Sequence, residues 1–395
     1  MEIRIAAIGN VDSAKSTTIG CLSHDILDDG RGLARSKILK HKHESETGRT
    51  SSITQYYIRK NNKVICFTDL AGHEKYLKTT AMGLSGCYID YALVTIGGDR
   101  GIIGMTKEHL QMAVALNIPI FIVITKIDIS PGHKLEKIIN RITKIMSSNA
   151  AGNLNCKIIT EKDSIESLKN FSEDKICPIF LTSNTLGTNL NNLKNFVYSL
   201  KNNYNWDLDS NKTVFTIDDS FKVKGIGLVI SGTMKEGNIN VDKKYLIGPF
   251  NGDFKQIIVK SIHNNFREHV NTLSSSCSGC LAIKVVNKKD KIDKELIKKG
   301  MVILSNKESV IKFKAEILVL NHPTTIRLNY QPVIHCGLIR QSAIITKMSK
   351  KYIRTGDKAI INFKFKYHPE WLELGDKIIF REGNTKGVGK IIEIN

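Results

Sequence analysis

Residues 3–17 of the chain are IRIAAIGNVDSAKST, a short apolar strand followed by a glycine-led loop and the start of a helical pattern. The loop nearly matches the phosphate-binding pattern G-x-x-x-x-G-K-[ST]. In that pattern backbone N–H groups surround the phosphates, the lysine reaches the β- and γ-phosphates, and the next hydroxyl binds Mg²⁺. Gly9, Lys15 and Ser16 fit, and Ala14 stands where the second glycine belongs. The stretch predicts a nucleotide site; a strand-to-helix turn with a solvated lysine is the alternative.

Length and charge bound the class of protein. A chain of 395 residues predicts two or three domains, and 41% hydrophobic with 24% charged residues is typical of a soluble globular protein. The formal net charge is +20, from 58 Lys and Arg against 38 Asp and Glu. Such an excess favours a polyanionic partner, most plausibly RNA. Coding bias towards lysine, asparagine and isoleucine is the alternative source of the charge.

Three features favour a cytoplasmic protein. The sequence enters its first strand at once, so we expect no signal peptide. The longest apolar run, over 118–125, is too short to cross a bilayer, and no membrane association is expected. The eight cysteines are scattered, and the pair Cys277 and Cys280 has no obvious second pair to complete a zinc site. We therefore expect reduced thiols.

Strands and helices alternate through the first half of the chain. Strands are expected over residues 3–8, 63–69, 92–96, 118–125 and 178–181, and helices over 19–27, over 106–116 and from 190 onward. This alternation predicts an α/β domain with a doubly wound, mainly parallel sheet. Ligands of such sheets bind at the carboxyl ends of the strands.

The second half has a different pattern. From about residue 212 short strands with period-two alternation are separated by glycine and Asp-Lys turns, which predicts an all-β region. Residues 201–211, rich in lysine, asparagine and aspartate, form the expected linker, and 305–308 is a polar break. The predicted domains are residues 1–205, 206–308 and 309–395.

Polar motifs follow several of the predicted strands in the first half. Asp69, in Asp-x-x-Gly, can bind Mg²⁺ through water, and the Gly72 N–H can meet a γ-phosphate. Asp128, in Thr-Lys-x-Asp, can accept hydrogen bonds from N1–H and N2–H₂ of guanine, a donor pair that adenine lacks. Lys126 can lie over the base, and Ser183 with the adjacent backbone can support the guanine O6. The order of these motifs predicts a guanine nucleotide site.

In this order the motifs resemble those of translational GTPases of the elongation factor Tu and elongation factor 1-alpha class, and most of all the eukaryotic GTP-binding protein 1 subfamily. The resemblance covers nearly the whole chain. It is carried by residues 9–12, 29–44, 48–52, 69–80 and 104–109 in the first half, and by 225–233, 322–325 and 380–389 in the second.

The resemblance implies a P-loop GTPase domain followed by two β-barrels, and a GTP-hydrolysing switch that acts as a monomer with tRNA, the ribosome or another RNA. It implies GTP or GDP and Mg²⁺ as cofactors. His73 would position the attacking water, with Lys15 and Thr50 as the other catalytic residues. Ser16, Thr50 and Asp69 would hold the metal, with Ser52 as the alternative to Thr50. The expected nucleotide-binding residues are Gly9, Asn10, Val11, Asp12, Ser13, Ala14, Lys15, Ser16, Thr17, Asp69, Gly72, Thr125, Lys126, Asp128, Ser183 and Asn184.

Two departures from the family pattern leave alternatives open. Thr125 replaces an asparagine whose amide would bond the purine N7 and brace the phosphate loop. The Cβ of Ala14 projects where the backbone must approach phosphate oxygens. Loss of one charge-assisted hydrogen bond there would weaken binding by about ten- to a hundredfold. A weakly or non-hydrolysing nucleotide- and RNA-binding module is therefore one alternative, and a GTPase regulatory subunit of a sulfate adenylyltransferase-like enzyme is another.

Overall fold

The computed structural model describes residues 2–38, 53–60, 63–204, 206, 212–287, 290, 292–382 and 385–394. Thr50 and Ser52, the two candidates for the Mg²⁺-closing hydroxyl, lie outside these residues. The chain divides into two compact units, one of residues 2–204 and the other formed essentially by the residues from 205 onward. Among the described residues, no helix combines the length and apolar character that a membrane crossing requires.

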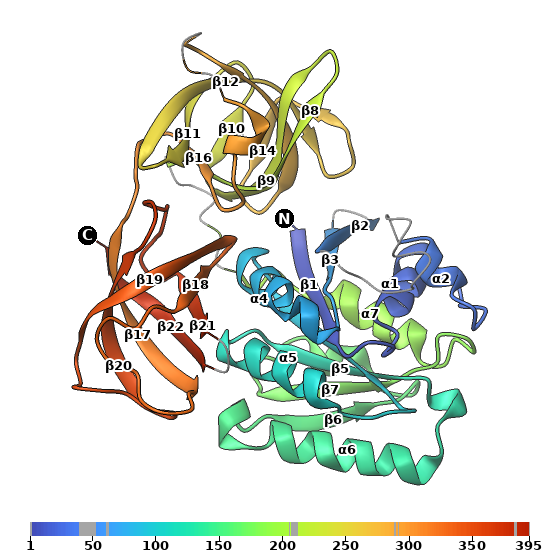
Figure 1. Cartoon of the computed structure of the whole chain (residues 1–395). Coiled ribbons are helices and arrows are strands. Elements are labelled where there is room, and N and C mark those ends of the chain that lie inside the picture. The colour runs from blue at the N-terminus through green and yellow to red at the C-terminus, as the bar shows by residue number, and fades with distance from the viewer. Residues whose placement is uncertain are drawn as a thin grey trace. The chain divides into compact units, whose positions relative to one another are not determined.

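A seven-stranded sheet in the order β2-β3-β1-β4-β5-β7-β6 forms the centre of the first unit (Figure 1). Neighbouring strands from β3 to β6 are parallel, as the sequence predicts, and β2 runs antiparallel to β3 at one edge. The fold class is confirmed. The strands are β1 Glu2–Gly9, β2 Thr54–Lys60, β3 Lys63–Asp69, β4 Tyr91–Gly97, β5 Ile120–Thr125, β6 Asn155–Ile159 and β7 Ile176–Leu181.

Helices cover both faces of this sheet. Alternate side chains of the central strands, such as Ile5 and Leu93, pack with Ile19 of α1 and Phe196 of α7 in one buried cluster. Helices α4 and α5 lie on the opposite face (Figure 1). The α-helices are α1 Lys15–His24, α2 Leu33–Ser36, α4 Leu77–Gly86, α5 Gly104–Ala115, α6 Gly132–Met146 and α7 Leu190–Ser199; the 3₁₀ turns are η1 Glu74–Tyr76, η2 Ile127–Ile129, η3 Asn149–Ala151 and η4 Ile165–Leu168.

The helix predicted over 19–27 is placed too late in the sequence. Helix α1 begins directly after the phosphate loop, where the Thr18 N–H donates to the Ala14 carbonyl at 2.9 Å. It ends at His24 because Asp25 has a φ of 56°, in the left-handed region. The loop and the helix N-terminus are therefore one continuous element, as anion binding at a helix start requires.

The second unit contains two closed barrels, as the resemblance implies. Six strands form a ring that the β11–β12 pairing closes: β8 Val214–Val223, β9 Gly227–Glu236, β11 Lys244–Phe250, β12 Asp253–Asn264, β15 Ser278–Val285 and β16 Val302–Leu304. The shorter β10 Asn238–Asn240, β13 His269–Val270, β14 Thr272–Ser274 and η5 Lys294–Leu296 lie within the same segment. The last ring is β17 Lys312–Asn321, β18 Val333–Cys336, β19 Ile339–Met348, β20 Lys358–Phe365, β21 Lys377–Glu382 and β22 Thr385–Ile394. Each encloses its own apolar core.

Candidate nucleotide-binding site

The predicted nucleotide residues meet at one edge of the sheet because the parallel strands end in register. Ala7 of β1 pairs with Asp69 of β3, and Gly97 of β4 pairs with Thr125 of β5. The loops after β1, β3, β5 and β7 therefore start at neighbouring positions. The sequence motifs, which lie as much as 175 residues apart from Gly9 to Asn184, are brought together there as predicted.

The phosphate loop is held in a strained backbone conformation. Gly9 has a φ of 143°, and a Cβ there would lie 2.3 Å from the Thr95 carbonyl oxygen. Asp12 and Ala14 both have a φ of 62°, in the left-handed region that disfavours residues with a Cβ. The buried Ser13 hydroxyl supports the loop from inside by donating to the Asn10 carbonyl at 2.8 Å. Val11 and Thr17 are half-buried beside it.

Thr125 braces this loop, contrary to the expectation from its replacement of asparagine. Its buried hydroxyl donates to the Ser13 carbonyl at 3.1 Å. The hydroxyl thus keeps the bracing part of the asparagine's role. Whether the contact to purine N7 is lost stays a prediction.

Lys15 lies inside the curve of the loop. Its ammonium group donates to the carbonyls of Asn10 at 2.7 Å and Gly9 at 3.2 Å. Burial lowers the Lys15 pKa to about 8, although the carboxylates of Asp69 and Asp12 act in the opposite direction. An anionic group beside this ammonium would favour its charged form, so the site suits a phosphate.

Ser16 and Asp69 form the candidate magnesium site. The Ser16 hydroxyl donates to the Asp69 carboxylate at 2.6 Å, and Asp69 is fully buried. Hydroxyl and carboxylate oxygens are the hard ligands that Mg²⁺ prefers. Among the described residues, no group of three or more His, Cys, Asp or Glu side chains could hold a metal. The donor set fits Mg²⁺, which typically takes one or two protein oxygens together with phosphate and water.

The Asp-x-x-Gly segment lies directly against the phosphate loop. A Cβ at Gly72 would lie 2.6 Å from the Lys15 ammonium nitrogen and 2.7 Å from the Val11 backbone nitrogen, so only glycine fits. The next residue, His73, is exposed, and its Nδ1 accepts a hydrogen bond from the Lys75 N–H at 3.1 Å. This contact orients the imidazole and leaves the proton of the neutral ring on Nε2.

Side chains from two loops meet at the predicted guanine end. The Thr185 hydroxyl donates to the Asp128 carboxylate at 3.3 Å and lies 3.0 Å from the hydroxyl of the buried Ser183. The Asn184 side chain instead donates to Thr18 of α1 at 3.1 Å, which ties the loop to the helix. Asp128 is exposed at the open end of this group. Thr185 was missed as a site residue, although it lies two positions after Ser183.

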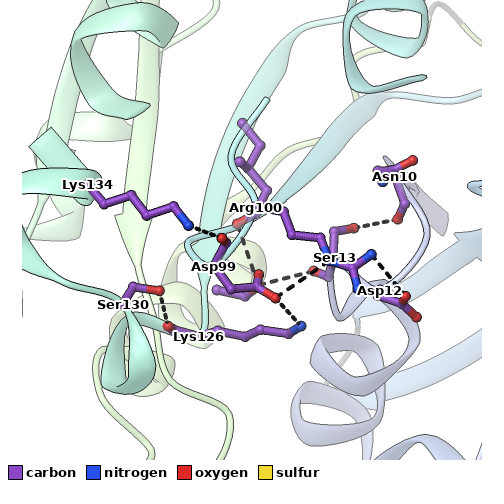
Figure 2. Close-up of polar contacts among 10 residues, drawn as sticks. Asn10, Asp12, Ser13, Asp99, Arg100, Lys126, Ser130 and Lys134 are labelled. Carbon is purple, nitrogen blue, oxygen red and sulfur yellow. Dashed lines mark hydrogen bonds and ion pairs between the residues drawn. The ribbon is translucent and has the colours of Figure 1, made fainter. Parts of the chain in front are cut away.

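A second group of residues was missed, in the loop after β4. Asp99 binds Lys126, and Arg100 binds Asp12 of the phosphate loop (Figure 2). Asp12, Asp99 and Arg100 border a small pocket together with Asn10, Val11, Ser13, Gly97, Gly101, Ile103 and Thr106. The stretch Gly98-Asp99-Arg100-Gly101 follows a buried strand, and this position at the carboxyl edge was the signal that could have identified it.

His109 of α5 supports the start of the phosphate loop through a hydrogen bond. Its Nδ1 accepts a hydrogen bond from the Gly9 N–H at 3.2 Å, and the side chain is fully buried. Burial lowers the His109 pKa to about 3, and the nearby Lys15 adds to this shift. The imidazole is therefore neutral near pH 7 and can accept this bond.

Comparison with known proteins identifies the family. Residues 2–203 match the family described as the Elongation factor Tu GTP binding domain. The chain belongs to the translational GTPase family. It is 41% identical to GTP-binding protein 1 of Xenopus laevis over 423 aligned residues, covering 100% of the chain and 64% of that relative. It is 34% identical to human GTP-binding protein 2, covering 100% of the chain and 69% of that relative.

A solved structure shares the fold over nearly the whole chain. The crystal structure of the S. cerevisiae Ski7 GTPase-like domain bound to GTP superposes with a TM-score of 0.78 at 15% identity, covering 99% of this chain and 97% of that one. At this identity the likeness concerns the fold alone. Guanine nucleotide binding and hydrolysis are general in translational GTPases, and this chain spans 64% of the length of its Xenopus relative.

Proposed function

We propose that this protein is a GTP-hydrolysing molecular switch of the translation elongation type, which acts as a monomer in the cytoplasm with tRNA, the ribosome or another RNA. One observation carries the proposal. At one end of the sheet edge, Ser16 donates a hydrogen bond to Asp69, and the Asp69 carboxylate favours the charged form of Lys15. At the other end, the Thr185 hydroxyl contacts both the Asp128 carboxylate and the Ser183 hydroxyl. Phosphates and a guanine base need these two groups of ligands respectively.

The guanine end and the phosphate end of the site would use different ligand groups. We propose that Asp128 accepts the two guanine donors, and that Thr185 keeps its carboxylate in place. Lys15 and the backbone N–H groups of residues 13–16 would bind the β- and γ-phosphates, and Ser16 and Asp69 would hold Mg²⁺ with them. When bound, the metal would neutralise charge that develops on the phosphates.

His73 is the residue that we propose for positioning the attacking water. It follows Gly72, whose backbone lies against Lys15, and the hydrogen bond from Lys75 sets the direction of its ring. His73→Ala should lower ribosome-stimulated GTP hydrolysis by about a hundredfold and change GTP affinity by less than about twofold. The assay is phosphate release with ribosomes, and His133→Ala, which removes an exposed imidazole at the start of α6, is the matched control. Unchanged stimulated hydrolysis in His73→Ala would contradict this role.

Nucleotide preference tests the proposal as a whole. Fluorescent guanine and adenine nucleotides should be titrated into the purified protein in the presence of Mg²⁺. We expect strong preference for guanine, because an adenine leaves the Asp128 carboxylate without its donors. Equal binding of the two bases would refute the proposal.

Ala14 supports a second candidate function, a nucleotide- and RNA-binding module that hydrolyses GTP weakly or not at all. Its left-handed conformation places strain in the loop that holds the phosphates. This candidate predicts guanine nucleotide binding without stimulation of hydrolysis by ribosomes. The phosphate-release assay on the unmodified protein therefore separates the two functions.

A further inference from the structure

Four side chains of alternating charge connect the two ends of the nucleotide site (Figure 2). The Arg100 guanidinium lies 3.3 Å from the Asp12 carboxylate of the phosphate loop and 3.9 Å from the Asp99 carboxylate. Asp99 in turn lies 3.1 Å from the ammonium group of Lys126, in the predicted guanine motif. The order is therefore Asp12, Arg100, Asp99, Lys126, and each neighbour has the opposite sign.

The middle of this chain of charges is well fixed. The Gly98 N–H donates to the Thr125 carbonyl at 2.9 Å, and the Gly101 N–H closes a turn onto Gly97 at 2.7 Å. The Lys134 ammonium group of α6 donates to the Asp99 carbonyl. A Cβ at Gly97 would lie 2.4 Å from an Asp99 carboxylate oxygen, so the absence of that carbon lets the carboxylate fold over the strand end.

The two residues at the ends of this series of charges have costly backbone conformations. Asp12 has a φ of 62° and Lys126 a φ of 60°, and neither is a glycine. Backbone in this region is costly for a residue with a Cβ and persists only where neighbouring groups hold it. Arg100 holds the side chain of the first, and Asp99 holds the side chain of the second.

We propose that Arg100 and Asp99 are positioning residues that couple the guanine end of the site to the phosphate loop. Binding of the base or of the phosphates at one end keeps both Lys126 and the phosphate loop in their binding conformations. Loss of either ion pair loosens both Lys126 and the phosphate loop. The inference rests on the proposed guanine nucleotide binding. It explains why two charged residues with no predicted nucleotide contact occupy the loop after β4.

The exposure of the pairs limits the expected effect. Arg100 and Asp12 have side chains that are 55% and 46% exposed, whereas Lys126 and Asp99 are 30% and 26% exposed. Exposed ion pairs contribute little, and less exposed ones are less screened by water and salt. Arg100→Gln should therefore accelerate GDP release by about threefold, and Asp99→Asn by about tenfold.

Stopped-flow release of a fluorescent GDP analogue measures these rates. Arg100→Lys keeps the charge and should restore most of the slow release, and the difference between Arg100→Gln and the unmodified protein should shrink as salt rises. Arg141→Gln, which removes an exposed guanidinium from α6, is the matched control and should leave release unchanged. Unchanged release in both Arg100→Gln and Asp99→Asn would overturn the inference.

A double-mutant cycle tests the coupling itself. If the charges act as one chain, Asp12→Asn and Asp99→Asn together should accelerate release by clearly less than the product of their separate factors. Multiplying factors would show two independent contacts and overturn the inference.

Nucleotide-free protein separates this inference from the proposed function. Amide hydrogen exchange over residues 9–16 should be faster in Arg100→Gln than in the unmodified protein, because the phosphate loop loses its support. If the unmodified protein binds no guanine nucleotide, the proposed function fails. Faster exchange in Arg100→Gln would then still show that Arg100 holds the loop, and unchanged exchange would overturn that as well.

Discussion

Replacing Ala14 by glycine should stabilise the nucleotide domain more than it improves nucleotide binding. Ala14 has a φ of 62° and a ψ of 27°, and its carbonyl accepts the first hydrogen bond of α1. An L-residue in this conformation costs about 1–2 kcal/mol because its Cβ approaches the following carbonyl, and glycine avoids this cost. The residue is thus already in the conformation that a glycine at this place would adopt.

The size of the effect follows from two opposing terms. Glycine relieves about 1–2 kcal/mol of strain but returns about 0.4–1 kcal/mol of backbone entropy to the unfolded chain. The net gain should be about 1 kcal/mol, or about 2–4 °C in the melting temperature of a domain of this size. If Ala14 keeps this conformation when nucleotide binds, the strain cancels in the binding equilibrium, and GDP affinity should rise by less than about tenfold. This is smaller than the ten- to hundredfold effect that the sequence alone suggests.

Thermal and denaturant unfolding of Ala14→Gly without nucleotide would test this, followed by isothermal titration with GDP. Asn117→Gly is the matched control: Asn117 is exposed, has a φ of 50°, and lies in a turn outside the site. Asparagine tolerates this region better than alanine, so its gain should be smaller. Unchanged or reduced stability of Ala14→Gly would refute the strain argument. A gain of more than tenfold in affinity would show that the methyl group displaces the phosphates.

Three further predictions each have a defined outcome. Asp128→Asn should shift preference from GTP towards xanthosine triphosphate, measured by fluorescent-nucleotide competition with the exposed Asp174→Asn as control. Filter binding of tRNA should weaken linearly on a log–log salt plot if the +20 charge contacts RNA, whereas salt-independent or absent binding would assign the charge to coding bias. Because burial lowers the His109 pKa from 6.5 to about 3, the unfolded state binds more protons between these values, and stability should fall as pH falls through them. The loss between pH 6.5 and 5 should be about 2 kcal/mol, and His109→Gln, which keeps an acceptor for the Gly9 N–H, should remove it.

The sequence was sufficient for the architecture because the physics of each half leaves a strong periodic pattern. Strand β3 was predicted with its observed bounds, since a buried parallel strand is a continuous apolar run ended by a polar residue. Strand β2 was missed because most of its residues, among them Tyr56 and Tyr57, are only partly buried at the sheet edge and follow a long charged stretch. The error at the start of α1 has a similar origin: the loop residues are polar, and the helix begins within them.

At the site, the motifs pointed to residues whose chemistry a ligand would require, and these residues meet at one sheet edge, whereas contacts that depend on a neighbouring residue were missed. Lys15, Asp69 and Asp128 follow from what phosphate, magnesium and guanine require, so their spacing in the sequence was informative. Thr125 was misjudged because its contact is with the Ser13 carbonyl, a backbone group that no motif specifies.

Arg100 was missed for the same reason, because its position depends on neighbouring residues. Its partner Asp12 lies 88 positions away, and only the parallel register of β1 and β4 brings the two loops together. Two left-handed residues at opposite ends of the site, Asp12 and Lys126, each have an oppositely charged partner, and residues 99 and 100 supply both from one turn. A single rigid turn that supports both ends can couple them, whereas two separate supports could not. The release rates of Arg100→Gln and Asp99→Asn, alone and combined with Asp12→Asn, therefore decide whether base and phosphate recognition in this protein are one event or two.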